Sequence, residues 1–376
     1  MQTDGADVII VGAGVIGCAI AYFLSKEGMK VVVVEKDGLG DHASGTAPGL
    51  LSPFLLAPGG VILPLARNSF RMHKVLYQQL KEESGIDYYF RESAHMRLAF
   101  TEAEVAELRL RVNLGQKQGF KLLRWLGKDD VRNLESRVSA EVVGAAYCEE
   151  GEVESYRFVL ALVQAAEKNG AEIRSGQVIG LTKKGTRATA VKLSSRSIPC
   201  EHIVLAMGPW AGTASSWLSL PVPVRPLRGQ AQWIRMPGLP FVYKLSRSGN
   251  YLITRTKRDG LTYLGNTQEE AGFDDQPTEE GMDYIIRGVL TMIPSLVEAE
   301  LVRRTACLRP LSADELPIIG KVPGWDNVYL ATGHGTEGIL LSTVTARIMT
   351  DLIVKGHTSI STEPFAPGRF FSRRPL

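Results

Sequence analysis

Hydrophobic positions near the start of the chain form two continuous runs with an apolar helical stretch between them. The runs are Val8–Val11 and Val31–Glu35, and Gly17–Lys26 predicts a helix. A strand that is buried on both faces of a parallel sheet reads as a continuous apolar run rather than as an alternating one. The N-terminal segment therefore predicts a βαβ unit.

Similar segments recur in the middle and at the end of the chain. Helices are predicted at Arg67–Gly85, Tyr156–Asn169 and Gly338–Val354, and apolar strands at Ala171–Ile173, Ile203–Met207 and Val328–Ala331. Residues 88–147 mix strand-like pieces with charged helical ones. Residues 221–265 are rich in proline, aromatic residues and alternation, which favours an antiparallel sheet.

This order predicts an α/β fold with two discontinuous domains. We expect a Rossmann-like nucleotide-binding domain from residues 1–87, 148–219 and 303–376. An antiparallel β-sheet domain that binds the substrate is expected from residues 88–147 and 220–302. The chain length of 376 residues agrees with this division, since a domain takes roughly 150 residues.

Composition and charge exclude several classes of protein. Apolar residues make up 44% of the chain and charged residues 22%, as in globular proteins, so neither a disordered nor a fibrous protein is expected. The formal net charge is +3 without a long run of Lys or Arg, and we therefore expect no nucleic acid partner. The four cysteines form no CxxC pair and the six histidines lack ligand spacing, which predicts no metal site and a reducing, cytoplasmic location.

One stretch is close to a membrane span in length. Residues Val8–Leu24 carry no charge, but acidic residues precede them and three glycines interrupt them at fixed spacing. A signal peptide would need a positively charged region at this place. We therefore expect no transmembrane segment here.

The glycines of this stretch form a dinucleotide-binding fingerprint, because they follow a strand and open a helix. Gly12 permits a tight turn, Gly14 lets the backbone approach a pyrophosphate, and Gly17 allows the helix to pack closely on the strand. Glu35 stands 18 residues after Gly17, where a carboxylate can accept hydrogen bonds from ribose hydroxyls. The pattern predicts FAD or NAD, and the carboxylate disfavours NADP.

A second glycine-rich loop favours FAD over NAD. Residues 333–339 join a predicted strand to a helix, and the amino end of that helix can stabilise the anionic edge of a reduced flavin. A reductase that uses both flavin and NAD usually repeats the fingerprint, and the sequence has no second GxGxxG after a strand. A pyridine-nucleotide reductase is kept as an alternative.

Together, several motifs resemble the D-amino-acid-oxidase (DAO) superfamily of FAD-dependent oxidoreductases, and within it the glycine oxidases. The motifs are the N-terminal fingerprint, Ala43-Ser44, Gly49-Leu50-Leu51, Leu308-Arg309-Pro310, Leu316–Gly320 and Gly333–Ile339. The resemblance runs from about residue 6 to about residue 355. It implies a glutathione-reductase-like FAD-binding domain beside an antiparallel substrate domain.

The resemblance also implies which residues bind FAD. They lie in the fingerprint, at the end of the second strand, in the segment after it and in the C-terminal glycine loop. The expected cofactor-binding residues are Gly12, Gly14, Val15, Ile16, Gly17, Glu35, Lys36, Ala43, Ser44, Pro48, Gly49, Leu50, Val178, Gly208, Gly333, His334, Gly335, Thr336, Glu337, Gly338, Ile339 and Leu340. Val178 would hold the adenine end, and the loop that begins at His334 would lie at the flavin ring.

Arg309 and Tyr251 are the expected substrate-binding and catalytic residues. By resemblance, Arg309 binds the substrate carboxylate and Tyr251 assists it. A guanidinium can bind a carboxylate through two parallel hydrogen bonds, and the apolar neighbours of Arg309 suit such a clamp. The alternatives are a structural salt bridge for Arg309 and a half-buried sheet tyrosine for Tyr251.

Two positions depart from the glycine oxidases. Thr336 stands where they have a second arginine, which leaves room for a larger substrate or a secondary amine. Cys307 stands two residues before Arg309, where sarcosine-oxidase-like relatives attach their flavin covalently. Because residues 311–320 follow the glycine-oxidase pattern, we expect FAD to be bound without a covalent link.

The sequence therefore predicts an FAD-dependent oxidase of a small amino acid or secondary amine, of the glycine, sarcosine or D-amino-acid type. Hydride transfer to flavin N5 would yield the imine, with O2 as the electron acceptor. One alternative is a D-amino-acid or proline-type dehydrogenase that reduces a quinone or partner flavoprotein, with peripheral membrane association. Another is a non-catalytic FAD-binding assembly subunit. The sequence leaves the substrate, the acceptor and a homo-oligomeric state open.

Overall fold

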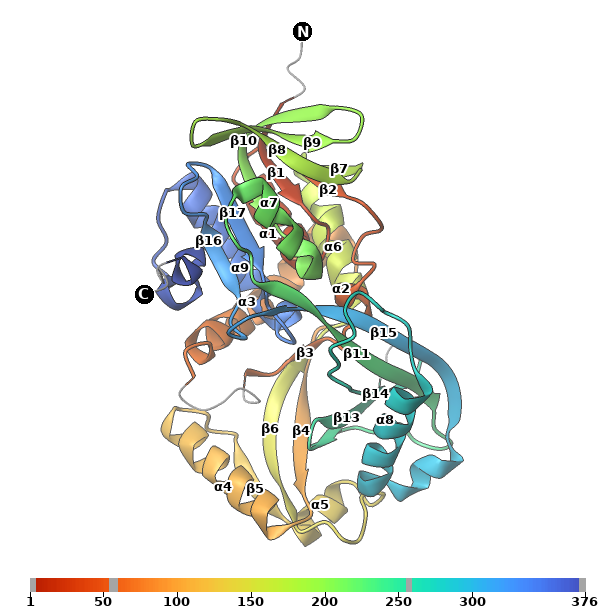
Figure 1. Cartoon of the computed structure of the whole chain (residues 1–376). Coiled ribbons are helices and arrows are strands. Elements are labelled where there is room, and N and C mark those ends of the chain that lie inside the picture. The colour runs from red at the N-terminus through yellow and green to blue at the C-terminus, as the bar shows by residue number, and fades with distance from the viewer. Residues whose placement is uncertain (1–4, 54–59, 255–258, 372–376) are drawn as a thin grey trace, which may run out of the picture.

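Two β-sheets form the framework of the molecule, one in the upper half of Figure 1 and one in the lower half. The computed structural model describes residues 5–53, 60–254 and 259–371. The chain crosses between the sheets several times, so each sheet combines segments that are far apart in the sequence.

The first sheet has eight strands and a parallel central part. Its order is β16-β17-β10-β1-β2-β7, in which β16 runs antiparallel to β17 and the other neighbours are parallel. The β8–β9 hairpin continues it from β10. The strands are β1 Ala6–Val11, β2 Val31–Glu35, β7 Glu172–Ser175, β8 Val178–Lys184, β9 Arg187–Leu193, β10 Ser197–Leu205, β16 Ile318–Lys321 and β17 Val328–Thr332.

A layer of helices covers one face of this sheet. These are α1 Val15–Lys26, α3 Leu63–Ser84, α6 Ser155–Lys168 and α9 Gly338–Val354. Val8 and Ile10 of β1 pack in the core formed with these helices, whereas Ile9 and Val11 pack in the core on the opposite face. That face is covered by the β8–β9 hairpin, η2 (Gly208–Ala214) and α7 (Ser215–Leu218). Since successive strand residues point to opposite faces, burial on both sides explains why β1 is apolar throughout.

The second sheet has nine strands and is largely antiparallel. Its order is β15-β11-β14-β13-β12-β4-β6-β3, with β5 paired to β6 and a parallel pair between β12 and β4. Three helices, α4 Glu102–Lys117, α5 Lys128–Leu134 and α8 Glu279–Met292, flank it. The strands are β3 Leu50–Leu51, β4 Arg91–Ala99, β5 Arg124–Gly127, β6 Gly144–Glu152, β11 Val224–Arg235, β12 Lys244–Arg247, β13 Asn250–Thr254, β14 Thr262–Gly265 and β15 Glu300–Ser312.

The structure agrees with most elements expected from the sequence and shifts the edges of several. β2 and α9 have the predicted bounds, whereas α3 begins four residues before Arg67. The predicted domain boundaries at 147/148 and 302/303 fall inside β6 and β15, two strands of the second sheet. The division into two domains stays a prediction. Residues 1–4, 54–59, 255–258 and 372–376 of the predicted domains lie outside the described ranges.

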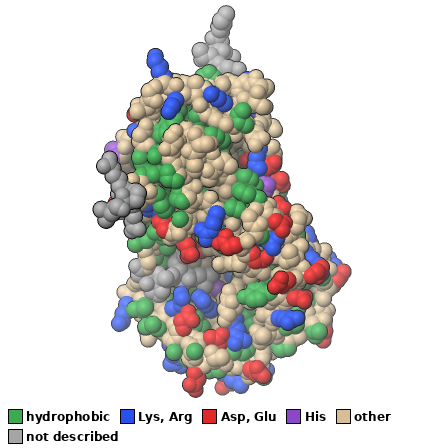
Figure 2. Space-filling view, in the orientation of Figure 1, with side chains coloured by type: hydrophobic (Ala, Val, Ile, Leu, Met, Phe, Trp, Pro, Cys, Tyr) green, Lys and Arg blue, Asp and Glu red, His purple; other side chains and the backbone are tan. Residues whose placement is uncertain are grey.

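The long uncharged run near the N-terminus is divided between β1 and α1. Within the described ranges, no helix is both long enough and apolar enough to cross a membrane. On the face shown in Figure 2, acidic and basic side chains are mixed over the lower half of the molecule.

The turn between β1 and α1 depends on Gly12. Its φ angle is +108°, and an added Cβ atom would lie 2.4 Å from the carbonyl oxygen of Ala206 after β10. A side chain at this position would therefore push β1 and β10 apart. The turn places the amino end of α1 at the carboxyl edge of the sheet.

We predict that Gly12→Ala destabilises the fold more than Gly28→Ala does. Both glycines have positive φ, which costs a residue with a Cβ atom roughly 1–2 kcal/mol, but an added Cβ at Gly28 meets nothing within 4 Å. The clash at Gly12 adds about 1–3 kcal/mol from overpacking. Urea unfolding followed by circular dichroism measures both losses, and equal losses would contradict the clash.

Candidate functional site

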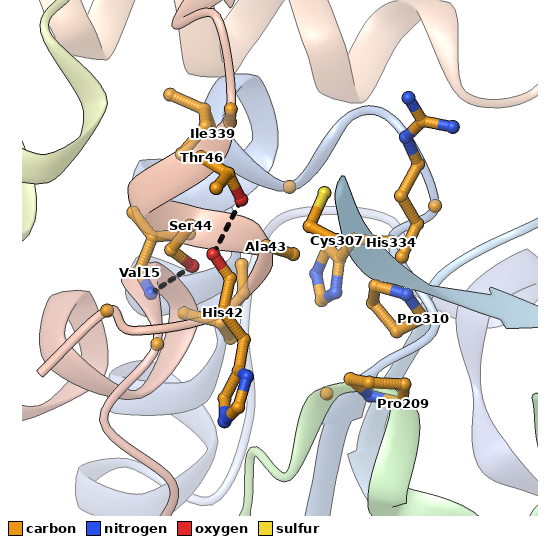
Figure 3. A pocket seen from close by; sticks show the side chains of 18 of the residues that line it. Val15, His42, Ala43, Ser44, Thr46, Pro209, Cys307, Pro310, His334 and Ile339 are labelled. Atoms are coloured by element: carbon orange, nitrogen blue, oxygen red, sulfur yellow. Dashed lines mark hydrogen bonds between the residues drawn. The ribbon is translucent and has the colours of Figure 1, made fainter. Parts of the chain in front are cut away.

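A cavity of about 750 Å³ lies between the two sheets. Its walls combine the carboxyl ends of β1, β2 and β17 from the first sheet with residues of β4, β12, β13 and β15 from the second. Figure 3 shows the part of the cavity around the amino end of α1 and the glycine loop that precedes α9. The cavity is therefore formed by segments that only the tertiary fold brings together.

Most of the residues singled out in the sequence lie on this wall. They are Gly12, Gly14, Val15, Ile16, Glu35, Lys36, Ala43, Ser44, Pro48, Gly49, Leu50, Val178, Gly208, Tyr251, Arg309, His334, Gly335, Thr336, Glu337, Gly338 and Ile339. Gly17, Gly333 and Leu340 do not line it. Gly17 instead packs against the carbonyl of Gly12, and Leu340 of α9 is buried in the core between the helices and the first sheet.

Two segments cross-link the amino end of α1. The N–H of Val15 donates to the hydroxyl oxygen of Ser44 at 2.9 Å, and the N–H of Ala13 donates to Glu35 Oε2 at 2.7 Å. The hydroxyl of Thr46 donates in turn to the carbonyl oxygen of His42. These bonds hold the glycine turn, the end of β2 and the residues after it as one surface.

A cation and two aromatic rings extend this surface, and sequence reasoning missed two of them. Lys36 Nζ lies 3.9 Å from the ring centroid of Trp210. The imidazole ring of His42 packs against the same Trp210 ring, with the two centroids 4.5 Å apart. All three residues line the cavity. Trp210 follows the Gly208-Pro209 break, the one feature of the sequence that could have drawn attention to it.

The loop before α9 carries two titratable groups at the wall. Burial lowers the pKa of His334 to about 3, so its imidazole is neutral near pH 7. Its Nε2 atom is 3.0 Å from Thr345 Oγ1, while its buried Nδ1 atom has no partner in the described chain. Burial raises the pKa of Glu337 to about 7, and the hydroxyl of Thr336 donates to this carboxyl group.

The chemistry of the wall fits FAD. Both α1 and α9 begin at the cavity, and in the described structure neither is capped by the side chain of its own N-cap residue or carries an acidic residue in its first turn. The two helix amino ends provide N–H donors and positive potential for anionic groups, and the unpartnered His334 Nδ1 atom adds a neutral polar group to the wall. Gly14 leaves the approach to α1 open, since an added Cβ would meet a single atom, Ser44 Oγ, at 3.3 Å.

Arg309 is positioned by a glycine on the neighbouring strand. An added Cβ atom at Gly229 of β11 would lie 2.2 Å from Arg309 Cζ, so the guanidinium of β15 lies directly over the Gly229 backbone. Its Nη1 atom donates to the carbonyl oxygen of Thr267 at 2.9 Å. Gly229 was missed in the sequence, although glycine inside a strand often marks close approach of another group.

Tyr251 lies on the same wall as Arg309. Its ring stacks on Tyr263 with centroids 5.8 Å apart and planes 8° from parallel. Burial raises the pKa of Tyr251, although the charge of Arg309 and hydrogen bonds with Asn266 and Tyr263 partly oppose this rise. Tyr251 is thus a neutral hydrogen-bonding group within electrostatic reach of the guanidinium.

Polar residues of β4 and β12, backed by Glu150 of β6, form a further part of the wall that the sequence did not reveal. His95 Nε2 is 2.8 Å from Ser246 Oγ, and its Nδ1 is 3.1 Å from the buried carboxylate of Glu150. The hydroxyl of Ser52 also donates to Glu150. Burial alone would raise the pKa of Glu150, but the charge of His95 and their hydrogen bond, helped by Lys244, hold it at about 2.

Ligand-type atoms of His95, Cys148 and Glu150 all lie within 4.8 Å of one another. The thiol of Cys148 and the imidazole of His95 each contact an oxygen of Glu150. This cluster is therefore held together by its own hydrogen bonds. Cys307, in contrast, is half-buried and lines the cavity two residues before Arg309.

Comparison with known proteins places the chain in a family. Residues 7–352 match the DAO family, described as FAD dependent oxidoreductase. A curated glycine oxidase from Geobacillus kaustophilus is 28% identical over 377 residues, covering 99% of each chain. The crystal structure of glycine oxidase from the same organism superposes with a TM-score of 0.91 at 28% identity, over 96% of this chain and 98% of that one.

The fold extends to more distant proteins. The crystal structure of L-proline dehydrogenase from P. horikoshii superposes with a TM-score of 0.87 over 98% of both chains, but at 20% identity. That likeness shows a shared fold alone. The match over nearly the whole chain, together with a cavity whose wall fits a flavin dinucleotide, shows that this protein is an FAD-dependent oxidoreductase of the DAO family.

Proposed function

We propose that this protein oxidises a small amino acid or a secondary amino acid to its imine, with O2 as the electron acceptor. The observation that carries the proposal is the guanidinium of Arg309, which lies over Gly229 at the wall of the FAD cavity. One of its N–H groups is bonded to Thr267, and this bond orients the remaining donors. A carboxylate is the partner that such a fork binds best.

The residues around Arg309 would hold the substrate rather than exchange a proton with it. Arg309 binds the carboxylate, and Tyr251 supplies a neutral hydroxyl beside it. His334, with its pKa of about 3, adds no positive charge that would repel the substrate amine.

Bound FAD would accept the hydride of the amine-bearing carbon, and the amino ends of α1 and α9 would stabilise the negative charge of the cofactor. The curated relative and the most similar structure named above are glycine oxidases, which supports O2 as the acceptor. Thr336 in the loop before α9 carries no charge, which leaves room for a substrate larger than glycine or for a secondary amine.

Arg309→Ala is expected to lower kcat/KM for carboxylate substrates by about 30- to 5,000-fold. This is the cost of removing one partner from a buried charged hydrogen bond. The test compares sarcosine with dimethylamine, its analogue without a carboxylate, by anaerobic flavin reduction. The rate of flavin reduction by dimethylamine should differ little between Arg309→Ala and the wild-type protein. FAD content should be unaffected.

Arg303→Ala is the matched control, since Arg303 lies on β15 over the ring of Trp233 and outside the cavity. It should leave both amines unchanged. Equal losses for both amines in Arg309→Ala would mean that Arg309 has a structural role.

Glu337 should make carboxylate binding weaker as pH rises. Its pKa of about 7 leaves the group neutral at pH 6 and anionic at pH 8, where it repels a bound carboxylate. Propionate binding, followed by the flavin spectrum, should weaken by roughly 3- to 30-fold over this interval. Glu337→Gln should remove the dependence, and Glu27→Gln, at the far end of α1, should keep it.

FAD is expected to be released on acid precipitation. Cys307 lines the cavity, but it lies in a chain segment that follows the glycine-oxidase pattern. Yellow supernatant and a colourless pellet are the expected result. A yellow pellet that loses its colour in Cys307→Ala would instead establish a covalent link.

A further inference from the structure

A row of paired residues crosses the second sheet on the side of the cavity. Gly265 of β14 pairs with Tyr251 of β13, Tyr251 with Ser246 of β12, and Ser246 with Arg97 of β4. Directly paired residues point to the same face of a sheet. Accordingly Tyr251, Ser246 and Arg97 all line the cavity.

Arg97 differs from the other charged residues in this part of the wall. It is half-buried, and its guanidinium has no hydrogen bond or ion pair with any residue in the described ranges. Burial, together with the charge of Arg111, lowers the pKa of the guanidinium from its ordinary value, although arginine stays protonated. Its charge is therefore desolvated without a bound counter-ion.

The carboxylates whose charge reaches Arg97 are Glu107 and Glu150. Glu107 accepts a hydrogen bond from Arg111 at 2.9 Å, and Glu150 is bonded to His95 and Ser52. The internal stretches 54–59 and 255–258, which lie outside the description, contain no acidic residue in the sequence. A partner for Arg97 would thus have to come from the cavity.

The neighbouring cation on β12 is already neutralised. Lys244 Nζ donates to the carbonyl oxygen of Gly151 and lies 3.3 Å from a carboxylate oxygen of Glu152. His95, which also lines the cavity, is held between Ser246 and Glu150. Among the described cations of this wall, Arg97 can therefore, like Arg309, accept an anion without breaking an existing ion pair.

We propose that Arg97 forms a second anion-binding subsite, which takes the side-chain carboxylate of an acidic amino acid while Arg309 takes the α-carboxylate. The proposal rests on the proposed oxidation of amino acids, and it specifies the substrate as a molecule with two carboxylates.

The spacing of the sheet agrees with such a substrate. Two strand intervals, of about 4.8 Å each, separate Tyr251 from Arg97, and Tyr251 lies beside Arg309. This is a separation between backbones, from which the two long arginine side chains can reach a diacid of four or five carbons with a hydrogen bond of about 2.9 Å at each end. Both ends of the molecule would then be paired with a guanidinium.

The test compares succinate with its monoamide, succinamate, which has the same shape and one charge less. Binding to the FAD-loaded protein is followed by the flavin absorbance and by the shift in melting temperature. The wild-type protein should bind succinate at least about 10-fold more tightly. Arg97→Gln should bind both equally, and Arg97→Lys should keep part of the preference.

Arg303→Gln is the matched control, because it removes a positive charge on β15 that lies over the ring of Trp233 and does not line the large cavity. It should keep the preference for succinate. No preference in the wild-type protein, or an unchanged preference in Arg97→Gln, would overturn the subsite. If Arg97→Gln fails to retain FAD, the preference for succinate over succinamate is compared between the wild-type protein and Arg97→Lys. A preference in the wild-type protein that is reduced in Arg97→Lys supports the subsite.

Anaerobic flavin reduction by both enantiomers of aspartate and asparagine separates the two proposals. Preference for aspartate that is lost in Arg97→Gln supports both. If small amino acids reduce the flavin but succinate is not preferred, the oxidation stands and the subsite fails. If succinate is preferred and no amino acid reduces the flavin, the subsite stands and the oxidation fails.

Discussion

The parallel alignment of β1 and β17 is the constraint on which the cavity depends. Both strands run parallel to β10 between them, and the helices that follow them, α1 and α9, pack together in the layer on one face. Their amino ends must then lie at the same edge of the sheet. Two sources of positive potential converge there, and an anionic cofactor can be held largely by backbone groups.

The second sheet adds the features that the first cannot provide. Its wall carries guanidinium groups, hydroxyls and a buried histidine–carboxylate pair at the cavity. In a low-dielectric setting the difference between a satisfied and an unsatisfied charge is large. Lys244 and Glu150 are paired with other residues of the described chain, whereas Arg309 and Arg97 have no carboxylate partner there. Under the two proposals above, these unpaired charges are the ones that would bind the substrate.

The sequence predicted the elements whose signals are local. The runs at Val8 and Val31, the spacing of Gly12 and Glu35, and the loop before Gly338 each depend on neighbouring residues. Arg309 came from a resemblance, and its apolar neighbours Leu308 and Pro310 suit a substrate clamp without excluding a salt bridge.

Gly229 and Arg97 could not be predicted in this way. Gly229 matters because β15 pairs with β11 in one register, and Arg97 because β4 lies beside β12, about 150 residues later in the chain. In β4 the polar His95 and Arg97 alternate with the core residues Met96 and Leu98. That alternation predicts a strand with one polar face, but an exposed face and a cavity wall give the same pattern.

The long pairing of β11 with β15 also has a mechanical consequence. These strands are hydrogen-bonded from Val224 and Ser312, beside η2, to Arg235 and Glu300 at the far side of the second sheet. A twisted ribbon of this length acts as a strut between the two halves of the molecule. A hinge motion that separates the two halves would require the β11–β15 pair to bend or to lose hydrogen bonds. The pairing of β11 with β15 therefore opposes a hinge motion between the two halves and favours exchange of ligands through smaller movements of loops and side chains.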